Sequence, residues 1–223
     1  MEYKHYVFDV DGTLLDSEYA VLNAWKDMIF DLQGKEYTTK DLRFSLGVPS
    51  ESTIQRLGIT DIYMAYRVWL KYFLTYQSSI KLFDGIPELI RQLNAKGIKT
   101  GIVTSKPRSE YNDEPHLRQI AEYMDTVICA TDSERHKPYP DPLLVYMERT
   151  GMRAQDIIYI GDTSYDWQCA RAAGVKFALA LWSESAQRNI EADYYLEQPK
   201  DILTLDKPKR FKVRSFPLYN YYL

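Results

Sequence analysis

The chain has 223 residues, of which 45% are hydrophobic and 26% are charged. This composition allows a sizeable core and excludes an intrinsically disordered protein. The formal net charge of −3 provides no general attraction to nucleic acid, and no apolar run approaches the length of a membrane span. We therefore expect neither nucleic acid nor membrane as a partner. The two cysteines, Cys129 and Cys169, fall in predicted core elements, which favours a reducing, cytoplasmic location.

The first third of the chain predicts one strand followed by helices. Residues 6–10 predict a short buried strand that enters a turn at Asp11-Gly12. Apolar residues at i, i+3, i+4 spacing then predict amphipathic helices. These amphipathic helices are expected at residues 17–32 and 61–76, and a further short helix is expected at residues 39–44. Because they follow one another without an intervening strand, residues 16–80 are predicted to form an inserted helical cap.

After Gly85, strands and helices alternate. Strands are expected at residues 99–104, 126–130, 157–160, 175–181 and 193–196, and helices at residues 87–96, 114–123, 141–150 and 165–173. This alternation predicts an α/β fold, with a Rossmann-like, mainly parallel sheet and helices on both faces. The predicted division is a core of residues 1–15 and 81–205, the cap of residues 16–80, and a C-terminal tail of residues 206–223. The basic, tyrosine-rich tail is expected to be solvated or loosely docked, with partner binding as the alternative.

Polar side chains follow four of the predicted strands. They are Asp9 and Asp11, Thr104 and Ser105, Lys137, and Asp162 and Asp166. Because the carboxyl ends of parallel strands meet at one edge of a sheet, we expect these groups to converge. Each group alone is also typical of a turn or a helix cap. Together, the carboxylates would repel one another without a cation, and oxygen ligands favour Mg²⁺. A carboxylate can attack phosphorus, and a lysine and hydroxyls can hold the phosphoryl group.

The pattern of these groups resembles the four motifs of the haloacid dehalogenase (HAD) superfamily. The matching segments are Asp9-Val10-Asp11-Gly12-Thr13, Ile102-Val103-Thr104-Ser105, Lys137-Pro138-Tyr139-Pro140 and Gly161-Asp162-Thr163-Ser164-Tyr165-Asp166. The resemblance covers roughly residues 5–200. The cap, inserted between the first two motifs, is similar to the small helical cap of the branch that contains phosphoglycolate phosphatases and β-phosphoglucomutases.

The resemblance implies a role for each of these residues. Asp9 would be the nucleophile and a magnesium ligand. Asp11 would act as the general acid and base, and its carbonyl oxygen would bind magnesium. Thr104 and Ser105 would hold the phosphoryl group, and Lys137 would bridge Asp9 and the phosphate. Magnesium would also be bound by Asp162, with Asp166 completing or supporting its ligand shell.

Asp11 also favours phosphate ester chemistry, because an alkoxide leaving group needs a proton and a halide does not. The resemblance implies a phosphatase acting on a small phosphorylated metabolite, as a monomer or weak dimer. The loop of residues 43–49 is the candidate for contacts to the substrate, and Arg43 is either a substrate-binding or a surface residue. A phosphosugar mutase is the alternative enzyme. A non-catalytic phosphate-responsive module is the third hypothesis, although such modules are about half as long and lack the cap.

Overall fold

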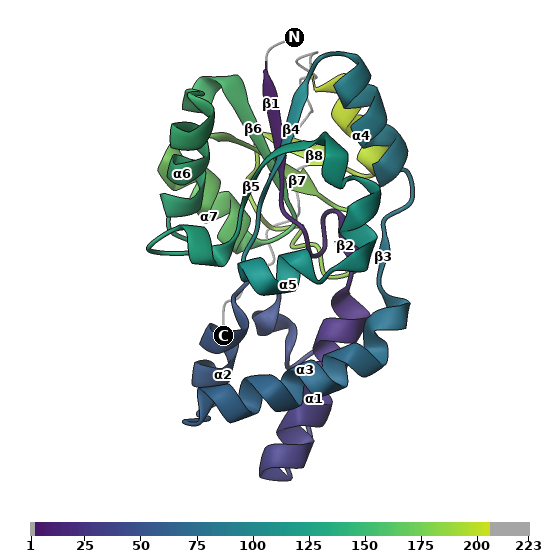
Figure 1. The fold of residues 1–223 in the computed structure, drawn as a ribbon, viewed down its shortest axis with the longest axis vertical. Coiled ribbons are helices and arrows are strands. Elements are labelled where there is room, and N and C mark those ends of the chain that lie inside the picture. The colour runs from purple at the N-terminus through teal and green to yellow at the C-terminus, as the bar shows by residue number, and fades with distance from the viewer. Residues whose placement is uncertain (1–2, 206–223) are drawn as a thin grey trace, which may run out of the picture.

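The computed structural model describes residues 3–205, which form a parallel sheet flanked by helices and a smaller helical part beside it (Figure 1). The six strands have the order β5-β4-β1-β6-β7-β8, and every neighbouring pair is parallel. Their bounds are β1 His5–Phe8, β4 Lys99–Val103, β5 Met124–Ile128, β6 Ile157–Gly161, β7 Lys176–Ala180 and β8 Tyr194–Leu196. The predicted Rossmann-like α/β fold is confirmed.

Helices cover both faces of this sheet. In Figure 1, α6 and α7 lie on one side and α4 lies on the other. The α-helices here are α4 Ile86–Ala95, α5 Arg108–Asn112, α6 Asp141–Thr150 and α7 Ser164–Ala173. Short 3₁₀ helices connect or follow them at η3 Pro115–Gln119, η4 Ala121–Tyr123, η5 Ala130–Asp132, η6 Ala154–Asp156 and η7 Pro199–Thr204.

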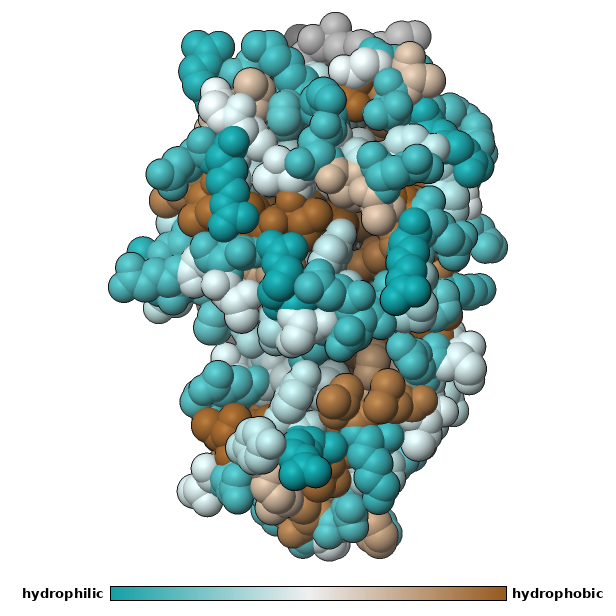
Figure 2. All heavy atoms as spheres, viewed as in Figure 1, coloured by the Kyte–Doolittle hydropathy of each residue, from teal (hydrophilic) through white to brown (hydrophobic). Residues whose placement is uncertain are grey.

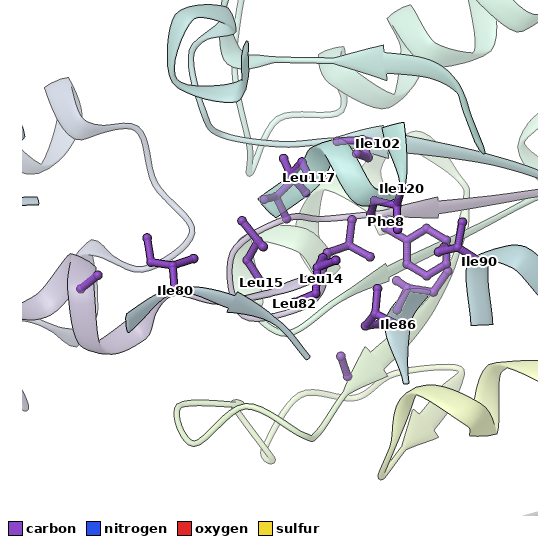
Figure 3. Packing of buried hydrophobic residues seen from close by; sticks show 14 of the residues in the cluster. Phe8, Leu14, Leu15, Ile80, Leu82, Ile86, Ile90, Ile102, Leu117 and Ile120 are labelled. Atoms are coloured by element: carbon purple, nitrogen blue, oxygen red, sulfur yellow. The ribbon is translucent and has the colours of Figure 1, made fainter. Parts of the chain in front are cut away.

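The period of two along each strand separates the core into two clusters. Val7 packs on one face with residues of α6 and α7, whereas the next residue, Phe8, packs on the other face. Figure 3 shows Phe8 and Ile90 close together on that second face, with Leu14 and Leu82 packed beside them. This second cluster continues into the helical part, so the two parts of the molecule share buried apolar surface.

The helical part consists of α1 Glu18–Gln33, η1 Arg43–Ser45, α2 Ser50–Arg56, α3 Ile62–Tyr76 and η2 Gln77–Ser79. Helices α1 and α3 pack against each other, and the rings of Trp25 and Trp69 lie 5.1 Å apart between them. A short antiparallel ribbon, β2 Leu15–Asp16 and β3 Lys81–Leu82, carries the chain into and out of this part. The division at residues 15/16 and 80/81 remains our proposal; the first boundary falls within β2 and the second directly before β3.

Two predicted helices are wrong. Residues 39–42 form turns and residues 43–44 begin the 3₁₀ helix η1, because the Asp41 carboxylate accepts bonds from the Thr38 backbone N–H and hydroxyl and so stabilises a local turn. Residues 114–123 form η3 and η4 instead of one helix, since the backbone at Ile120 leaves the helical region with φ −123°. The sequence reading also missed α2, which begins directly after Pro49.

The visible face of the molecule is largely hydrophilic, with scattered hydrophobic residues (Figure 2). Within residues 3–205, no helix is both long enough and apolar enough to cross a membrane. The basic and tyrosine-rich tail predicted at residues 206–223 lies outside the described residues.

Candidate active site

The loop after β1 approaches the loop after β6 closely enough that a side chain would not fit between them. Gly12 has φ +80°, and a Cβ added to it would lie 2.2 Å from Oδ2 of Asp162. Thr13, the next residue, donates a hydrogen bond from Oγ1 to Oδ1 of Asp162 at 3.2 Å. Glycine therefore meets both the backbone conformation and the spacing that bring the predicted first and fourth motifs together.

A buried network joins three of the predicted site residues. The Lys137 ammonium donates to Oδ1 of Asp9 at 2.8 Å, to Oδ1 of Asp166 at 2.7 Å and to the Tyr159 hydroxyl at 3.2 Å. These three bonds use all three of its hydrogens. The Lys137 side chain is 1% exposed. Burial opposes its charge, but Asp166 and Asp9 hold the pKa of Lys137 above its ordinary value.

Local helix chemistry fixes Asp166 in this network. Thr163 caps α7, and its Oγ1 accepts a hydrogen bond from the Asp166 backbone N–H at 3.3 Å. In return, Oδ2 of Asp166 accepts from the Thr163 backbone N–H at 3.0 Å and from the Thr163 hydroxyl at 2.6 Å. Oδ1 of Asp166 accepts from Lys137 and lies 3.0 Å from the Tyr159 hydroxyl. Both oxygens of Asp166 are therefore occupied within the protein, which orients Lys137 toward Asp9.

Three of the four predicted metal-binding carboxylates form a tight cluster. Asp9, Asp162 and Asp166 are buried, and each offers an oxygen within 4.8 Å of the others. Burial, opposed by Lys137 and assisted by Asp166, raises the pKa of Asp9 to about 7. Burial and the charges of Asp166 and Asp9 also raise the pKa of Asp162 well above its ordinary value. A divalent cation among these oxygens would offset that repulsion, so the residues present fit a hard metal ion.

Asp11, the fourth carboxylate, points away from this cluster toward different partners. Ser17 donates to its Oδ1 at 2.6 Å, and the Lys106 ammonium lies 3.1 Å from its Oδ2. Burial disfavours the charge of Lys106, but Asp11 and Glu110 raise the pKa of that ammonium above its ordinary value. The side chain of Asp11 is thus held at the cavity described next.

A cavity of about 50 Å³ lies between the sheet edge and the helical part. Asp9, Asp11, Thr104 and Ser105 line it on the sheet side. The structure thus places these four predicted residues around one space, with Lys137, Asp162 and Asp166 directly behind Asp9. Ser105 also donates from Oγ to the backbone carbonyl of Gly47 at 2.9 Å, which ties the two sides of the cavity together.

The helical side of the cavity is built partly from the predicted loop. Residues 45–48 line it, whereas Arg43 forms an ion pair with Glu18 at 3.3 Å and does not line it. Trp25 and Trp69 are buried and line the cavity as well.

Sequence reasoning missed four residues of this site: Tyr159, Lys106, Glu110 and Tyr66. Glu110 on α5 accepts from the Tyr66 hydroxyl of α3 at 3.0 Å and from Ser50 of α2 at 3.3 Å. Lys106 and Glu110 follow directly after the second motif, and this position in the sequence was the available signal for them. Tyr159 lies inside an apolar strand, where nothing in the sequence distinguishes it from a core residue.

Comparison with known proteins gives a consistent set of relatives. A family model described as haloacid dehalogenase-like hydrolase matches residues 6–180. A putative pyrophosphatase PpaX of Caldanaerobacter subterraneus subsp. tengcongensis is 27% identical over 205 residues, which cover 90% of this chain and 93% of the relative. The pyrophosphatase PpaX of Halalkalibacterium halodurans is 27% identical over 209 residues, covering 92% of this chain and 97% of the relative.

Solved structures include close matches in fold. A putative phosphoglycolate phosphatase from Lactobacillus plantarum superposes with a TM-score of 0.82 at 29% identity, covering 92% of this chain and 99% of the other. The likeness therefore extends over both the sheet and the inserted helices.

Proposed function

Because the chain belongs to the haloacid dehalogenase-like hydrolase family, we propose that it is a magnesium-dependent phosphatase that hydrolyses a small phosphomonoester through an aspartyl-phosphate intermediate. The family and the enzyme class predicted from the four motifs, a HAD-like phosphoric monoester hydrolase, are confirmed by the family match and by relatives named phosphatases. The observation that carries the proposal is the position of Asp9. It lies at the wall of a small cavity, with Lys137 bound to one of its carboxylate oxygens.

The buried carboxylates support the choice of metal. We propose that Asp9, Asp162 and the carbonyl oxygen of Asp11 would hold Mg²⁺, with Asp166 as a fourth candidate. Because the oxygens of Asp166 already accept bonds from Lys137 and Thr163, we assign Asp166 mainly to positioning Lys137. When bound, Mg²⁺ would offset negative charge on the phosphoryl oxygens and on the carboxylates around it.

The first step proposed is attack by Asp9 on phosphorus. Lys137 occupies Oδ1, which leaves Oδ2 as the attacking oxygen. As the Asp9–phosphorus bond forms, the bond from phosphorus to the leaving oxygen breaks, and Asp11 donates its proton to that oxygen. Thr104 and Ser105 would hold the phosphoryl oxygens at the edge of the sheet, and Lys137 would stabilise their charge.

The second step hydrolyses the aspartyl-phosphate. Asp11, now a carboxylate, takes a proton from a water molecule, whose oxygen attacks phosphorus while the Asp9–phosphorus bond breaks and inorganic phosphate leaves. The ammonium of Lys106 lies 3.1 Å from Oδ2 of Asp11 and helps to position that side chain. Contacts between the two sides of the cavity, such as Ser105 with Gly47, would exclude other water.

We further propose that the substrate is a small phosphorylated metabolite, since the cavity measures only about 50 Å³. A cytoplasmic location and a monomeric or weakly dimeric state are part of the same proposal.

The test is phosphate release from a panel of small phosphoesters, with added Mg²⁺ and with the metal chelated. We expect metal-dependent release and a loss of about 10³-fold or more in kcat for Asp9→Asn, which cannot form the aspartyl-phosphate intermediate. Asp84→Asn makes the same change at an exposed position and should leave kcat unchanged. Full activity of Asp9→Asn, or no release from any ester, would contradict the proposal. Isomerisation of a sugar phosphate without phosphate release would instead show that the protein is a phosphosugar mutase.

A further inference from the structure

The far wall of the cavity presents a carboxylate from α5. Glu110 lines the cavity, and its Oε1 accepts from the Tyr66 hydroxyl at 3.0 Å and from Ser50 Oγ at 3.3 Å. Neither of these bonds uses Oε2. Both donors come from the helical part, so the carboxylate is held against that part at the cavity that Asp9 also lines.

The charges around this wall do not suit an anionic leaving group. Among the described residues that line the cavity, Lys106 is the only cationic side chain, against the carboxylates of Asp9, Asp11 and Glu110. Lys106 is already paired with Asp11 at 3.1 Å. A second carboxylate or phosphate brought against Glu110 would therefore meet a like charge without a free cation to balance it.

A second observation concerns the indole of Trp69, which lines the same cavity. Its Nε1–H is buried and has no hydrogen-bond partner among residues 3–205. Trp69 lies one turn after Tyr66 on α3 with the two rings stacked at 5.8 Å, so the indole stands beside the residue that holds Glu110. A hydroxyl group can both donate to a carboxylate and accept from an indole, whereas an ammonium can only donate and a carboxylate can only accept.

We propose that Glu110 and Trp69 form a binding site for an uncharged, hydroxyl-bearing leaving group, so that the preferred substrates are phosphate esters of small polyhydroxy alcohols. This inference rests on the proposed phosphatase function. The substrates proposed for this chain differ from those in the names of its relatives, because phosphoglycolate carries a carboxylate and pyrophosphate carries a second phosphate. Glu110 is a specificity-determining residue in this proposal, and it takes no part in the transfer of the phosphoryl group.

The test compares kcat/KM for four substrates of matched size: the esters 2-hydroxyethyl phosphate, phosphoglycolate and 2-aminoethyl phosphate, and the anhydride pyrophosphate. We expect 2-hydroxyethyl phosphate to exceed each of the other three by about tenfold or more. Preference for phosphoglycolate or pyrophosphate would overturn the exclusion of anions. Preference for 2-aminoethyl phosphate would overturn the assignment of a hydroxyl.

A charge-neutral variant tests the role of Glu110 directly. Glu110→Gln keeps the shape of the side chain, and we expect the ratio of kcat/KM for 2-hydroxyethyl phosphate to that for phosphoglycolate to fall about tenfold. Glu122→Gln makes the same change at an exposed position of η4 and should leave the ratio unchanged. An unchanged ratio in folded Glu110→Gln would overturn the proposal. If that variant does not fold, the comparison of the four substrates with the wild type decides whether the proposal holds.

p-Nitrophenyl phosphate separates this inference from the proposed function. If the wild type hydrolyses p-nitrophenyl phosphate and Asp9→Asn does not, the proposed phosphatase function holds whatever the order of kcat/KM among the four substrates. If the wild type then favours an anionic leaving group, only the inference about Glu110 fails. If no ester is hydrolysed, both fail together.

Discussion

The two walls of the cavity differ in how completely their polar groups are bound. On the sheet side, Lys137 donates its three hydrogens to Asp9, Asp166 and Tyr159, and both oxygens of Asp166 accept hydrogen bonds from the protein. The helical side also receives Glu110 from α5 of the sheet part. The hydrogen bonds to Glu110 all reach one oxygen, and among the described residues the indole N–H of Trp69 has no partner. The sheet side is therefore fixed before a substrate arrives, whereas the helical side retains groups that a leaving group can satisfy.

This difference suggests a division of labour between the walls. Attack on phosphorus needs a nucleophile and charges held in fixed positions, which a saturated buried network supplies. Discrimination between leaving groups needs polar groups that form hydrogen bonds with some leaving groups and not with others. Substitutions on the sheet side should therefore change kcat and stability together, and those on the helical side should change KM.

The largest effect is expected for Lys137→Met, which keeps the length of the side chain and removes its charge. Asp9 and Asp166 would lose their shared buried cation, so we expect the free energy of unfolding to fall by about 3 kcal/mol, measured by urea denaturation. The stabilisation of the phosphoryl charge would also be lost, and kcat should fall about 10³-fold.

A matched control for this variant is Lys99→Met. Lys99 pairs with Asp125 at 2.7 Å, as close as Lys137 is to its partners, but the two side chains are 56% and 33% exposed. Because exposed pairs contribute little, the free energy of unfolding should change by less than about 1 kcal/mol. Equal losses in the two variants would show that burial of the Lys137 network does not matter.

Tyr159→Phe should have an intermediate effect on the same wall. Its hydroxyl lies 2.8 Å from the carbonyl oxygen of Val103 and 3.0 Å from Asp166, and it accepts from Lys137. Removing it leaves buried partners unsatisfied, so we expect a loss of about 1 kcal/mol in the free energy of unfolding. Because Tyr159 positions Lys137 without reaching the cavity, kcat should fall up to about tenfold with KM unchanged. A change in KM alone would contradict this assignment.

The sequence predicted the sheet side far better than the helical side. Asp9, Thr104, Lys137 and Asp162 could be grouped because each follows a strand, and parallel strands bring their carboxyl ends to one edge. No comparable rule places Glu110 beside Tyr66, since their contact depends on how α3 docks against α5 across 44 residues of chain.

Local chemistry explains the remaining errors. The turn held by Thr38 and Asp41 replaced the short helix predicted at residues 39–44, and α2 was too short to show a clear period. Tyr159 was missed for a different reason. Its ring packs in the core like its apolar neighbours, and only its hydroxyl reaches Lys137.

The smallest effect is expected for Tyr66→Phe on the helical side. The variant keeps the ring that stacks on Trp69 and removes the bond to Oε1 of Glu110. Glu110 would keep Ser50 as a donor, so the carboxylate loses part of its orientation and none of its charge. We expect KM for 2-hydroxyethyl phosphate to rise about threefold with kcat unchanged, from loss of about one weak hydrogen bond. Tyr63→Phe, at a 73% exposed position of the same helix, should leave both constants unchanged. A fall in kcat for Tyr66→Phe would mean that the two walls are coupled during phosphoryl transfer, and that the division of labour between them does not hold.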